Sequence, residues 1–473
     1  MKFINRKKEL SSLNDWWTSS EPQFVVIYGR RRIGKTELIK QFIKDKPHIY
    51  FLAQQISEQE NLKTLGKLVG EYFDDLILKE KGFDSWAIFF EYIKKHVGQR
   101  LILAIDEFPY LAESNKSISS IFQAGWDEDW KDLPIVLILC GSSVAMMERE
   151  VLSSKAALYG RRTGQIRLNP FSFYEASEFF PGKCFEEQLK YFTVMGGNPG
   201  YLSRINQERT FEDNITQLIL SPASPLYSEV EFLLREELRE PRNYLAILKA
   251  IALNKTRISE IVNETGFEKS ILHKYLFILE DLQLVHKEYP VTEKNPLKSK
   301  KGLYKLQDQF FKFWFRYVLP NKSRIEEGKI RPVLESINSD LTSLVAENYE
   351  LIAREILRMN EDKIFSFDTI GRWWDRNEEI DVVALNEKES KILFGEVKWS
   401  IRPVGIDIME DLKRKARCVE WKKEERQEYY CLFSRSGFTE ALIKRARKAN
   451  DASELSRTRE SVFLFEKDGL IEL

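Results

Sequence analysis

Residues 24–44 read FVVIYGRRRIGKTELIKQFIK, and this stretch decides the fold. A short apolar strand breaks at a glycine, a loop follows, and a helical pattern begins after the second glycine. The loop matches GxxxxGK[ST], in which backbone N–H groups turn inward around phosphates and the helix N-terminus adds its positive dipole end. Lys35 would reach the β- and γ-phosphates of ATP, and the Thr36 hydroxyl would contact Mg²⁺. The predicted nucleotide contacts are Gly29, Arg30, Arg31, Arg32, Ile33, Gly34, Lys35, Thr36 and Glu37.

A phosphoryl-transfer site also needs a carboxylate at the end of a neighbouring buried strand. The stretch LILAIDE at residues 101–107 supplies one, because its five leading apolar residues are typical of a strand buried on both faces. Asp106 would hold Mg²⁺, and Glu107 would polarise the attacking water. An acidic turn after a core strand is the alternative explanation.

Further strand candidates lie at residues 48–52, 135–140 and 165–168, separated by helical stretches. This alternation predicts the α/β fold class, with a parallel five-stranded core of the P-loop NTPase type. The strand at 135–140 ends in Gly-Ser-Ser, where Ser142 could sense the γ-phosphate. A helix cap is an equal contender for this serine.

Two arginines, Arg161 and Arg162, precede the last predicted strand. They could lie in a solvated loop. They could also act as an arginine finger that stabilises phosphoryl-transfer charge in a neighbouring subunit of a homo-oligomer. The sequence leaves open which of the two would serve.

Several of these stretches together resemble the archaeal/bacterial ATPase family of the AAA+/STAND branch. The resemblance covers about residues 1 to 220. It implies a P-loop ATPase core followed by a helical lid, with Arg6 and Pro199 near the adenine and Ser142 or Ser143 acting as sensor 1. The stretches that carry it are FINRKKEL (3–10), the P-loop, DEFPYL (106–111), GSS (141–143) and GGNP (196–199).

A winged helix is predicted in the middle of the chain. Apolar residues recur at helical spacing in three stretches, and the turn at 263–266 has helix-turn-helix spacing. Residues 284–289 and 302–306 would then pair as a wing across a Lys-rich loop, since residues 286–305 carry a net charge of +4.

DNA is the partner that this segment suggests, through Lys269, His273 and Lys274 on the third helix. A lysine-rich wing would contact phosphates and confer affinity without reading sequence. Winged helices also serve as plain protein-protein spacers, so this alternative stays open. The aromatic stretch at 310–317 is most simply core.

A hairpin near the C-terminus brings acidic residues together. If Leu385 faces Ile392, then Asp381 falls opposite Glu396, and Lys398 shares a face with Glu396 because it lies two residues further along the strand. Asp381 and Glu396 would hold Mg²⁺ and Lys398 would orient water. Glu347 on the preceding helix would be a further acidic ligand.

The spacing D-x14-ExK resembles the PD-(D/E)xK nuclease superfamily, and the segment resembles the C-terminal domain that accompanies archaeal ATPases. The resemblance implies a metal-dependent nuclease-like fold, although such domains can be degenerate or used only for binding. Four domains are therefore expected: an ATPase core at 1–170, a helical lid and linker at 171–240, a winged helix-turn-helix at 241–320 and a nuclease-like α/β domain at 321–473.

Composition agrees with a soluble cytoplasmic protein that is not anchored in a membrane. The 473 residues contain 73 Lys plus Arg and 73 Asp plus Glu, which excludes a uniformly basic nucleic-acid coat protein. The four cysteines show no CxxC spacing, and no run of 18 apolar residues occurs. Basic residues are locally enriched, since residues 398–449 carry 14 basic and 8 acidic groups.

The function predicted from these features is a Mg²⁺-dependent ATPase coupled to DNA binding, with DNA cleavage by the C-terminal domain. The alternative is a nucleotide-switched regulatory or scaffold protein whose C-terminal domain is catalytically inert.

Overall fold

The computed structural model describes residues 3–238, 240–456 and 460–472, and the chain folds as two compact units. Unit 1 comprises Met1–Phe179, Gly197–Ile205 and Glu231–Glu240. Unit 2 comprises Phe180–Gly196, Asn206–Val230 and Pro241–Leu473. The finer division into four domains stays a prediction.

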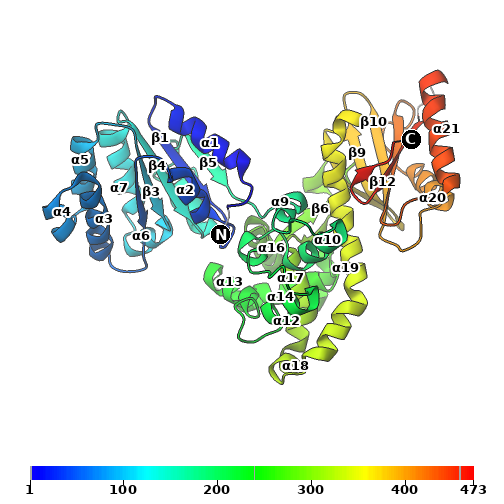
Figure 1. Ribbon diagram of the computed structural model, residues 1–473, viewed down its shortest axis with the longest axis horizontal. Coiled ribbons are helices and arrows are strands. Elements are labelled where there is room, and N and C mark those ends of the chain that lie inside the picture. The colour runs from blue at the N-terminus through cyan, green and yellow to red at the C-terminus, as the bar shows by residue number, and fades with distance from the viewer. Residues whose placement is uncertain (1–2, 239, 457–459, 473) are drawn as a thin grey trace. The chain divides into compact units, whose positions relative to one another are not determined.

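A five-stranded parallel sheet forms the centre of unit 1 (Figure 1). Its order β2-β3-β4-β1-β5 confirms the predicted parallel core, and β1 pairs with both β4 and β5. Every residue of β1, β3 and β4 is buried, which explains why these strands read as continuous apolar runs. The strands are β1 (Gln23–Tyr28), β2 (His48–Leu52), β3 (Leu101–Asp106), β4 (Ile135–Gly141) and β5 (Gly164–Arg167).

Both faces of this sheet are covered by helices. Alternate residues of the strands point to opposite faces. Val25 packs in a core with Leu13 of α1 and Leu38 of α2, whereas the Phe24 ring lies 5.2 Å from the ring of Trp126 in an aromatic cluster. The helices of unit 1 are α1 (Lys7–Thr18), α2 (Lys35–Ile43), α3 (Glu58–Phe73), α4 (Leu76–Lys81), α5 (Trp86–His96), α6 (Phe108–Ser114), α7 (Ile118–Gly125), α8 (Val144–Met147), α9 (Phe173–Ser177) and α11 (Pro199–Leu202); α13 (Glu229–Glu237) begins in unit 2 and ends in unit 1.

Unit 2 contains helices, a two-stranded hairpin and a second sheet. Its hairpin joins β6 (Val285–Glu288) and β7 (Leu303–Leu306) in antiparallel register, as the sequence predicts. The helices are α10 (Phe185–Met195), α12 (Phe211–Leu218), α14 (Pro241–Ala252), α15 (Ile258–Thr265), α16 (Lys269–Asp281), α17 (Gln309–Phe313), α18 (Lys322–Glu326), α19 (Ile330–Met359), α20 (Ile406–Ala416) and α21 (Glu440–Ser456). Short 3₁₀ and π segments are η1 (Trp126–Trp130) and η2 (Glu148–Leu152) in unit 1, and η3 (Pro296–Lys298), η4 (Trp314–Val318), η5 (Leu319–Asn321) and η6 (Glu361–Lys363) in unit 2.

The second sheet has six strands in the order β13-β12-β11-β10-β9-β8. Strands β8, β9 and β10 are antiparallel, and β10, β11 and β12 run parallel. On one face Tyr349 of α19 packs against Trp399 and Phe433, and on the other Met409 and Leu412 of α20 join the core. The strands are β8 (Thr369–Asp375), β9 (Glu378–Asn386), β10 (Lys391–Lys398), β11 (Gln427–Ser434), β12 (Glu460–Glu466) and β13 (Gly469–Leu470).

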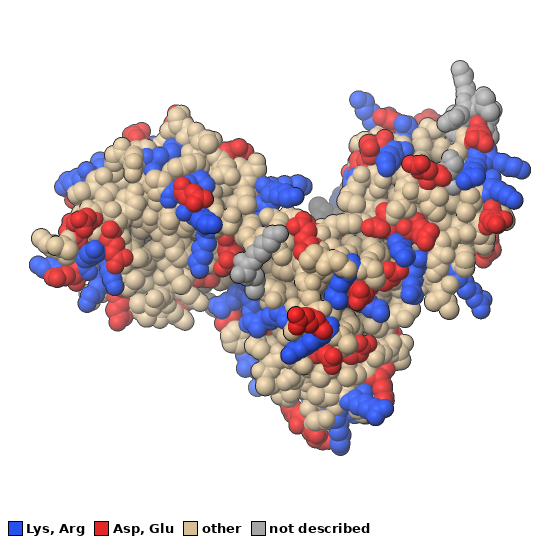
Figure 2. All heavy atoms as spheres, viewed as in Figure 1, with Lys and Arg blue, Asp and Glu red and all other residues tan. Residues whose placement is uncertain are grey.

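The surface carries both signs of charge in close alternation. On the visible face, Lys and Arg side chains lie interspersed with Asp and Glu side chains over most elements (Figure 2). This mixture agrees with the balance of charges in the sequence. No helix in the described part of the chain combines the length and hydropathy that a bilayer crossing requires.

Candidate functional site

The loop between β1 and α2 has the conformation that its glycines allow. Gly34 caps α2 in the left-handed region, with φ 87°. A Cβ atom on Gly29 would lie 2.5 Å from the carbonyl oxygen of Leu168, so no larger residue fits. The Lys35 ammonium folds into the loop and donates to the carbonyls of Gly29 and Arg30, both at 2.9 Å. The loop thus holds its lysine where a phosphate would be bound.

The predicted magnesium ligands meet at the carboxyl end of β3. Asp106 is completely buried, and its Oδ2 accepts hydrogen bonds from Thr36 Oγ1 at 2.7 Å and from Tyr50 OH at 2.8 Å. A hydroxyl and a carboxylate are oxygen ligands of the kind that Mg²⁺ prefers. Tyr50 was not predicted, because in the strand HIYFL it reads as one more apolar residue.

Glu107 lies beside the serine that the sequence singled out. Its backbone adopts the left-handed conformation, with φ 55°, and its Oε2 accepts from Ser142 Oγ at 2.7 Å and from the Ser142 N–H at 3.2 Å. The structure therefore brings together the candidate water-polarising carboxylate and the candidate sensor. Ser143, and not Ser142, precedes α8 as its first flanking residue, without a capping side-chain bond.

A cavity of about 690 Å³ opens over this loop. Arg6 lies at its edge, where Nη2 donates to the carbonyls of Ile33 at 3.1 Å and Asn169 at 2.8 Å, and its guanidinium stacks 4.1 Å from the Phe171 ring centre. Pro199 opens α11 on the same cavity. Of the predicted residues, the lining includes Arg6, Arg31, Arg32, Ile33, Gly34, Lys35, Thr36, Glu37, Glu107, Ser142 and Pro199.

Two carboxylates at the end of α13 approach the loop, and the sequence analysis does not single them out because other glutamates stand in the same helix. Glu236 forms an ion pair of 2.9 Å with Arg31. Burial raises the pKa of Glu237 to about 7, and the nearby charges of Arg31, Lys35 and Arg30 only partly oppose this shift. A negative charge therefore titrates beside the phosphate-binding loop near neutral pH.

The two candidate finger arginines make contacts within unit 1. Arg161 forms an ion pair of 2.9 Å with Asp127, and Arg162 donates to the carbonyl of Leu152 at 3.2 Å. Neither is among the described residues that line the nucleotide cavity. A role across subunits stays a prediction and would require these contacts to break.

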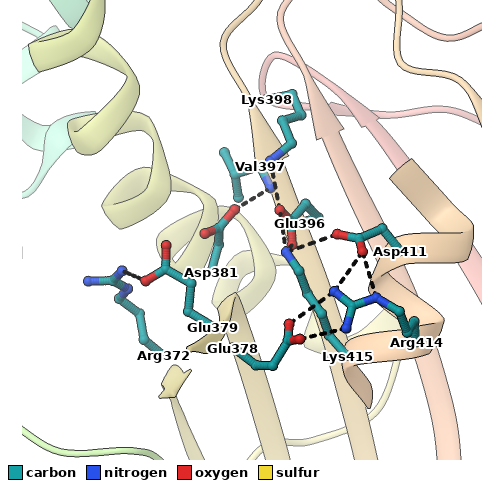
Figure 3. A network of polar contacts seen from close by, with 10 residues as sticks. All are labelled: Arg372, Glu378, Glu379, Asp381, Glu396, Val397, Lys398, Asp411, Arg414 and Lys415. Atoms are coloured by element: carbon teal, nitrogen blue, oxygen red, sulfur yellow. Dashed lines mark hydrogen bonds and ion pairs between the residues drawn. The ribbon is translucent and has the colours of Figure 1, made fainter. Parts of the chain in front are cut away.

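The C-terminal hairpin has the predicted register, since Ile392 pairs with Leu385 and Gly395 pairs with Val382. Asp381 and Glu396 are both buried at the same end of the hairpin (Figure 3). Burial and the neighbouring Glu396 together raise the pKa of Asp381 to about 6, although the Val397 N–H, which donates to Asp381 at 2.9 Å, opposes this shift. Repulsion between two buried carboxylates is relieved by a bound cation.

Two lysines contact Glu396. Lys398 Nζ lies 2.6 Å from Glu396 Oε1, and Lys415 Nζ of α20 lies 3.2 Å from the same oxygen (Figure 3). Lys415 also contacts Asp411, which joins Glu378 through Arg414. Lys415 was not predicted, because its contact with Glu396 depends on how α20 packs against the sheet.

The helical acid at this site differs from the predicted one. Glu347 of α19 is paired with Lys312 and lies 3.8 Å from Arg316, which turns it away from the hairpin. Glu350, one turn further on, interacts with Asp381 instead, and burial together with Asp381 raises the pKa of Glu350 to about 7. Glu350 is therefore a glutamate of α19 that interacts with Asp381, and a metal-binding role of Glu347 stays a prediction. In the described residues no group of three His, Cys, Asp or Glu side chains is already arranged around a metal position.

A third candidate surface lies in the helix-and-hairpin part of unit 2. A cavity of about 590 Å³ is lined by the cations Arg257, Lys269, Lys287 and Lys300, together with His273. No described residue lining it is Asp or Glu. Of the predicted third-helix set, Lys269 and His273 line this groove, whereas Lys274 is exposed and does not line it.

Comparison with known proteins gives matches at both ends of the chain. Residues 3–205 match a family model described as an ATPase domain predominantly from Archaea, and residues 314–424 match one described as archaeal and bacterial proteins of unknown function. An uncharacterized protein of Methanocaldococcus jannaschii is 38% identical over 436 residues, which cover 91% of this chain and 95% of the relative.

A short sequence match and a solved structure are also similar to parts of this chain. An uncharacterized ATP-binding protein of the same organism is 48% identical over 44 residues, which are 9% of this chain and 75% of that protein. The solved structure of a Walker-type ATPase of Pyrococcus abyssi is similar with a TM-score of 0.50 and 21% identity, covering 66% of this chain and 96% of that one. The last likeness shows the P-loop α/β fold.

Replacing Tyr50 with Phe should weaken the Mg²⁺ binding that ATP hydrolysis requires, without unfolding the chain. The change removes one of the two hydroxyl donors to Asp106 Oδ2, which is worth about 1 kcal/mol. We expect the Mg²⁺ concentration for half-maximal turnover to rise about fivefold. Tyr92→Phe is the matched control, since its hydroxyl bonds to Asp75. An unchanged Mg²⁺ requirement in Tyr50→Phe would contradict the assignment.

Replacing Glu237 with Gln should strengthen nucleotide binding in a pH-dependent way. Because its pKa is about 7, the carboxyl is mostly ionised at pH 8 and opposes the phosphates, and it is mostly protonated at pH 6. We expect Glu237→Gln to bind ATP several-fold more tightly than the wild type at pH 8 and about equally at pH 6. Titration calorimetry at both pH values measures this, with the exposed Glu91→Gln as control. Equal affinities at pH 8 would refute it.

Proposed function

The chain belongs to an archaeal family of P-loop ATPases, and we propose that it couples ATP hydrolysis to an action on DNA. ATP binding and hydrolysis follow from the family and from the loop geometry. The action on DNA is our inference from two further surfaces. These are the carboxylate pair of the C-terminal hairpin and the cationic groove of the helix-and-hairpin segment.

Each polar residue around the phosphate-binding loop would have its own role in ATP hydrolysis. Thr36 and Asp106 would hold Mg²⁺, which when bound supplies positive charge to the phosphate oxygens. Lys35 would leave the carbonyls of its loop to contact the β- and γ-phosphates. Glu107 would polarise the attacking water once Ser142 yields its hydrogen bond to the nucleotide, so that the serine couples the presence of a γ-phosphate to release of the carboxylate.

DNA binding would occur at the cationic groove, where α14, α15, α16 and the β6–β7 hairpin form a winged helix. The proposal is supported by the four cations that line the groove without an acidic neighbour in the lining. Such a set suits a phosphate backbone and confers no base recognition. Lys287 also lies over the rings of Tyr289 and Tyr304, which fixes its stem at the groove.

Phosphodiester hydrolysis in the C-terminal domain is carried by a single observation, the pair of buried carboxylates Asp381 and Glu396 beside Lys398. This set corresponds to the D-x14-ExK pattern of PD-(D/E)xK nucleases. Asp381, Glu396 and Glu350 would hold Mg²⁺, because their mutual repulsion favours a cation between them. Lys398 would orient the attacking water, and Lys415 would stabilise the phosphate charge.

One observation favours the alternative, a nucleotide-switched scaffold with an inert C-terminal domain. Glu396 already has two lysine ammonium groups as partners, Lys398 at 2.6 Å and Lys415 at 3.2 Å. These contacts neutralise the carboxylate without a metal ion. In a nuclease, metal binding would displace at least one lysine toward the substrate. In a scaffold, both would stay.

DNA affinity should depend on the groove lysines. We expect the combined Lys269→Ala and Lys300→Ala change to weaken binding of duplex DNA about tenfold at 0.1 M salt and to reduce the slope of log K against log salt by nearly two. Anisotropy titrations at several salt concentrations provide the measurement. The matched control is Lys329→Ala, an exposed lysine paired with Glu327. An unaltered slope would exclude the groove as the DNA site.

Cleavage should distinguish Glu350 of α19 from Glu347 of the same helix. With Mg²⁺ or Mn²⁺, plasmid nicking by the wild type should fall at least a hundredfold in Asp381→Ala, Lys398→Ala and Glu350→Gln, since each removes a ligand or the water-orienting group. Glu347→Gln should keep its activity, because Glu347 pairs with Lys312 away from the hairpin. If the wild type cuts no DNA substrate, or if all variants cut equally, the nuclease proposal fails and the scaffold remains.

A further inference from the structure

A second cavity in unit 2, of about 380 Å³, is lined in part by Glu350, but its cationic residues have no role in the functions proposed above. It is lined by residues of the β6–β7 hairpin, of α19 and of β8. Three cations converge on it from these three elements, namely Lys305 of β7, Arg354 of α19 and Arg372 of β8. Lys312 also lines the cavity but is paired with Glu347.

The carboxylate of Glu288 lies within 4 Å of all three cations. Glu288 lies 2.9 Å from Lys305 Nζ, 3.3 Å from Arg354 Nη1 and 3.8 Å from Arg372 Nη1. The Arg354, Arg372 and Glu288 side chains are only 18%, 15% and 11% exposed. The other carboxylates nearby belong to Glu350, 3.9 Å from Arg372 Nε, and to Glu379, which is 61% exposed. Asp381 also acts electrostatically on Arg372.

Several polar atoms of the cluster are buried without a hydrogen-bond partner among the described residues. They are the Nε–H groups of Arg354 and Arg372, Nδ1 of His286, and one acceptor, Glu288 Oε2, which forms its ion pair with Lys305. A buried donor without an acceptor costs about 1 to 3 kcal/mol. An anion in the cavity would supply acceptors to both guanidinium groups, which present N–H groups in a fixed fork.

The cavity lies next to the carboxylates of the hairpin. Glu350 lines the cavity and interacts electrostatically with Asp381, and Arg372 interacts with both. An anion held by Arg354 and Arg372 would therefore lie beside the proposed cation site. In a phosphodiesterase, that is where a neighbouring phosphate of the substrate belongs.

We propose that this cavity binds a phosphate monoester, the terminal phosphate of the nucleic-acid strand on which the C-terminal domain acts. This inference rests on the proposed action on DNA. A monoester carries a charge of about −1.5 to −2 and three terminal oxygens, which Lys305, Arg354 and Arg372 could contact together. An internal phosphodiester carries a single charge and would have to bring two ester-linked sugars into the cavity.

The test compares oligonucleotides of one sequence that carry a 5′-phosphate, a 3′-phosphate or no terminal phosphate. Affinities are measured by fluorescence anisotropy with the full chain in EDTA, so that binding is read without cleavage. We expect the wild type to prefer one phosphorylated end at least tenfold. Arg354→Gln and Arg372→Gln should lose the preference, whereas Arg331→Gln, an exposed arginine of the same helix, should retain it.

Glu288→Gln separates a binding site from a purely structural cluster. Removing the competing carboxylate should increase the preference for the phosphorylated end severalfold if the cations bind an anion. If they serve only to hold the fold, the same change should leave the preference absent. This variant also covers the case in which an arginine variant fails to fold.

Two further measurements identify the ligand. Inorganic phosphate at millimolar concentration should raise the melting temperature of the wild type more than that of Arg354→Gln, in which the phosphate-binding loop is intact, even if the protein binds no DNA, so failure of the DNA proposal is recognised separately. Equal affinity for all three oligonucleotides would overturn the strand-end assignment. Competition by AMP at concentrations far below those of the phosphorylated strand would also overturn it and assign the cavity to a free nucleotide.

Discussion

The carboxylate of Asp106 joins the nucleotide-binding loop to the sheet. A fully buried charge is stable only when its oxygens are hydrogen-bonded, and Asp106 receives donors from three separate segments, through Thr36 of α2, Tyr50 of β2 and the N–H of Glu107. The first turn of α2 is thereby fixed against the ends of β2 and β3. Glu107 follows in the left-handed conformation and reaches Ser142 at the end of β4. The geometry of this edge therefore depends on one buried side chain.

The local sequence pattern predicts a strand or a register correctly where neighbouring residues alone determine it. Strands such as β3 and β4 were found because a strand buried on both faces must be apolar throughout. The register of the C-terminal hairpin followed from a short connection, which leaves few ways to pair Leu385 with Ile392. Tyr50 and Glu237 were missed for the opposite reason. Their partners are distant in sequence, and neither residue differs from its neighbours in any way that sequence alone reveals.

The positions of Glu347 and Glu350 show more clearly what the sequence alone does not determine. The two residues lie three apart on one helix and so differ by about 60° around its axis. Sequence spacing places both on the same side of α19 but does not fix its rotation. Packing does, because the fully buried Tyr349 ring contacts Trp399 and Phe433 of the sheet. With Tyr349 fixed, Glu350 approaches Asp381 and Glu347 meets Lys312.

The net charge of a segment does not indicate well where a phosphate would bind. Whether its cationic side chains already form ion pairs is more informative. Several basic residues at 398–449 are already paired, since Arg414 contacts Glu378, Lys415 contacts Glu396 and Arg426 contacts Glu428. In the groove beside α16 the described lining contains cations and no carboxylate, so water and mobile ions screen its charge and a polyanion can displace them. The Glu288 cluster is intermediate, because its three cations all contact one buried carboxylate and only Arg372 has further carboxylate partners, Glu350 and Glu379, among the described residues. Where cations outnumber their partners inside a cavity, an anionic ligand gains the most, since the protein has already desolvated the groups that would bind it.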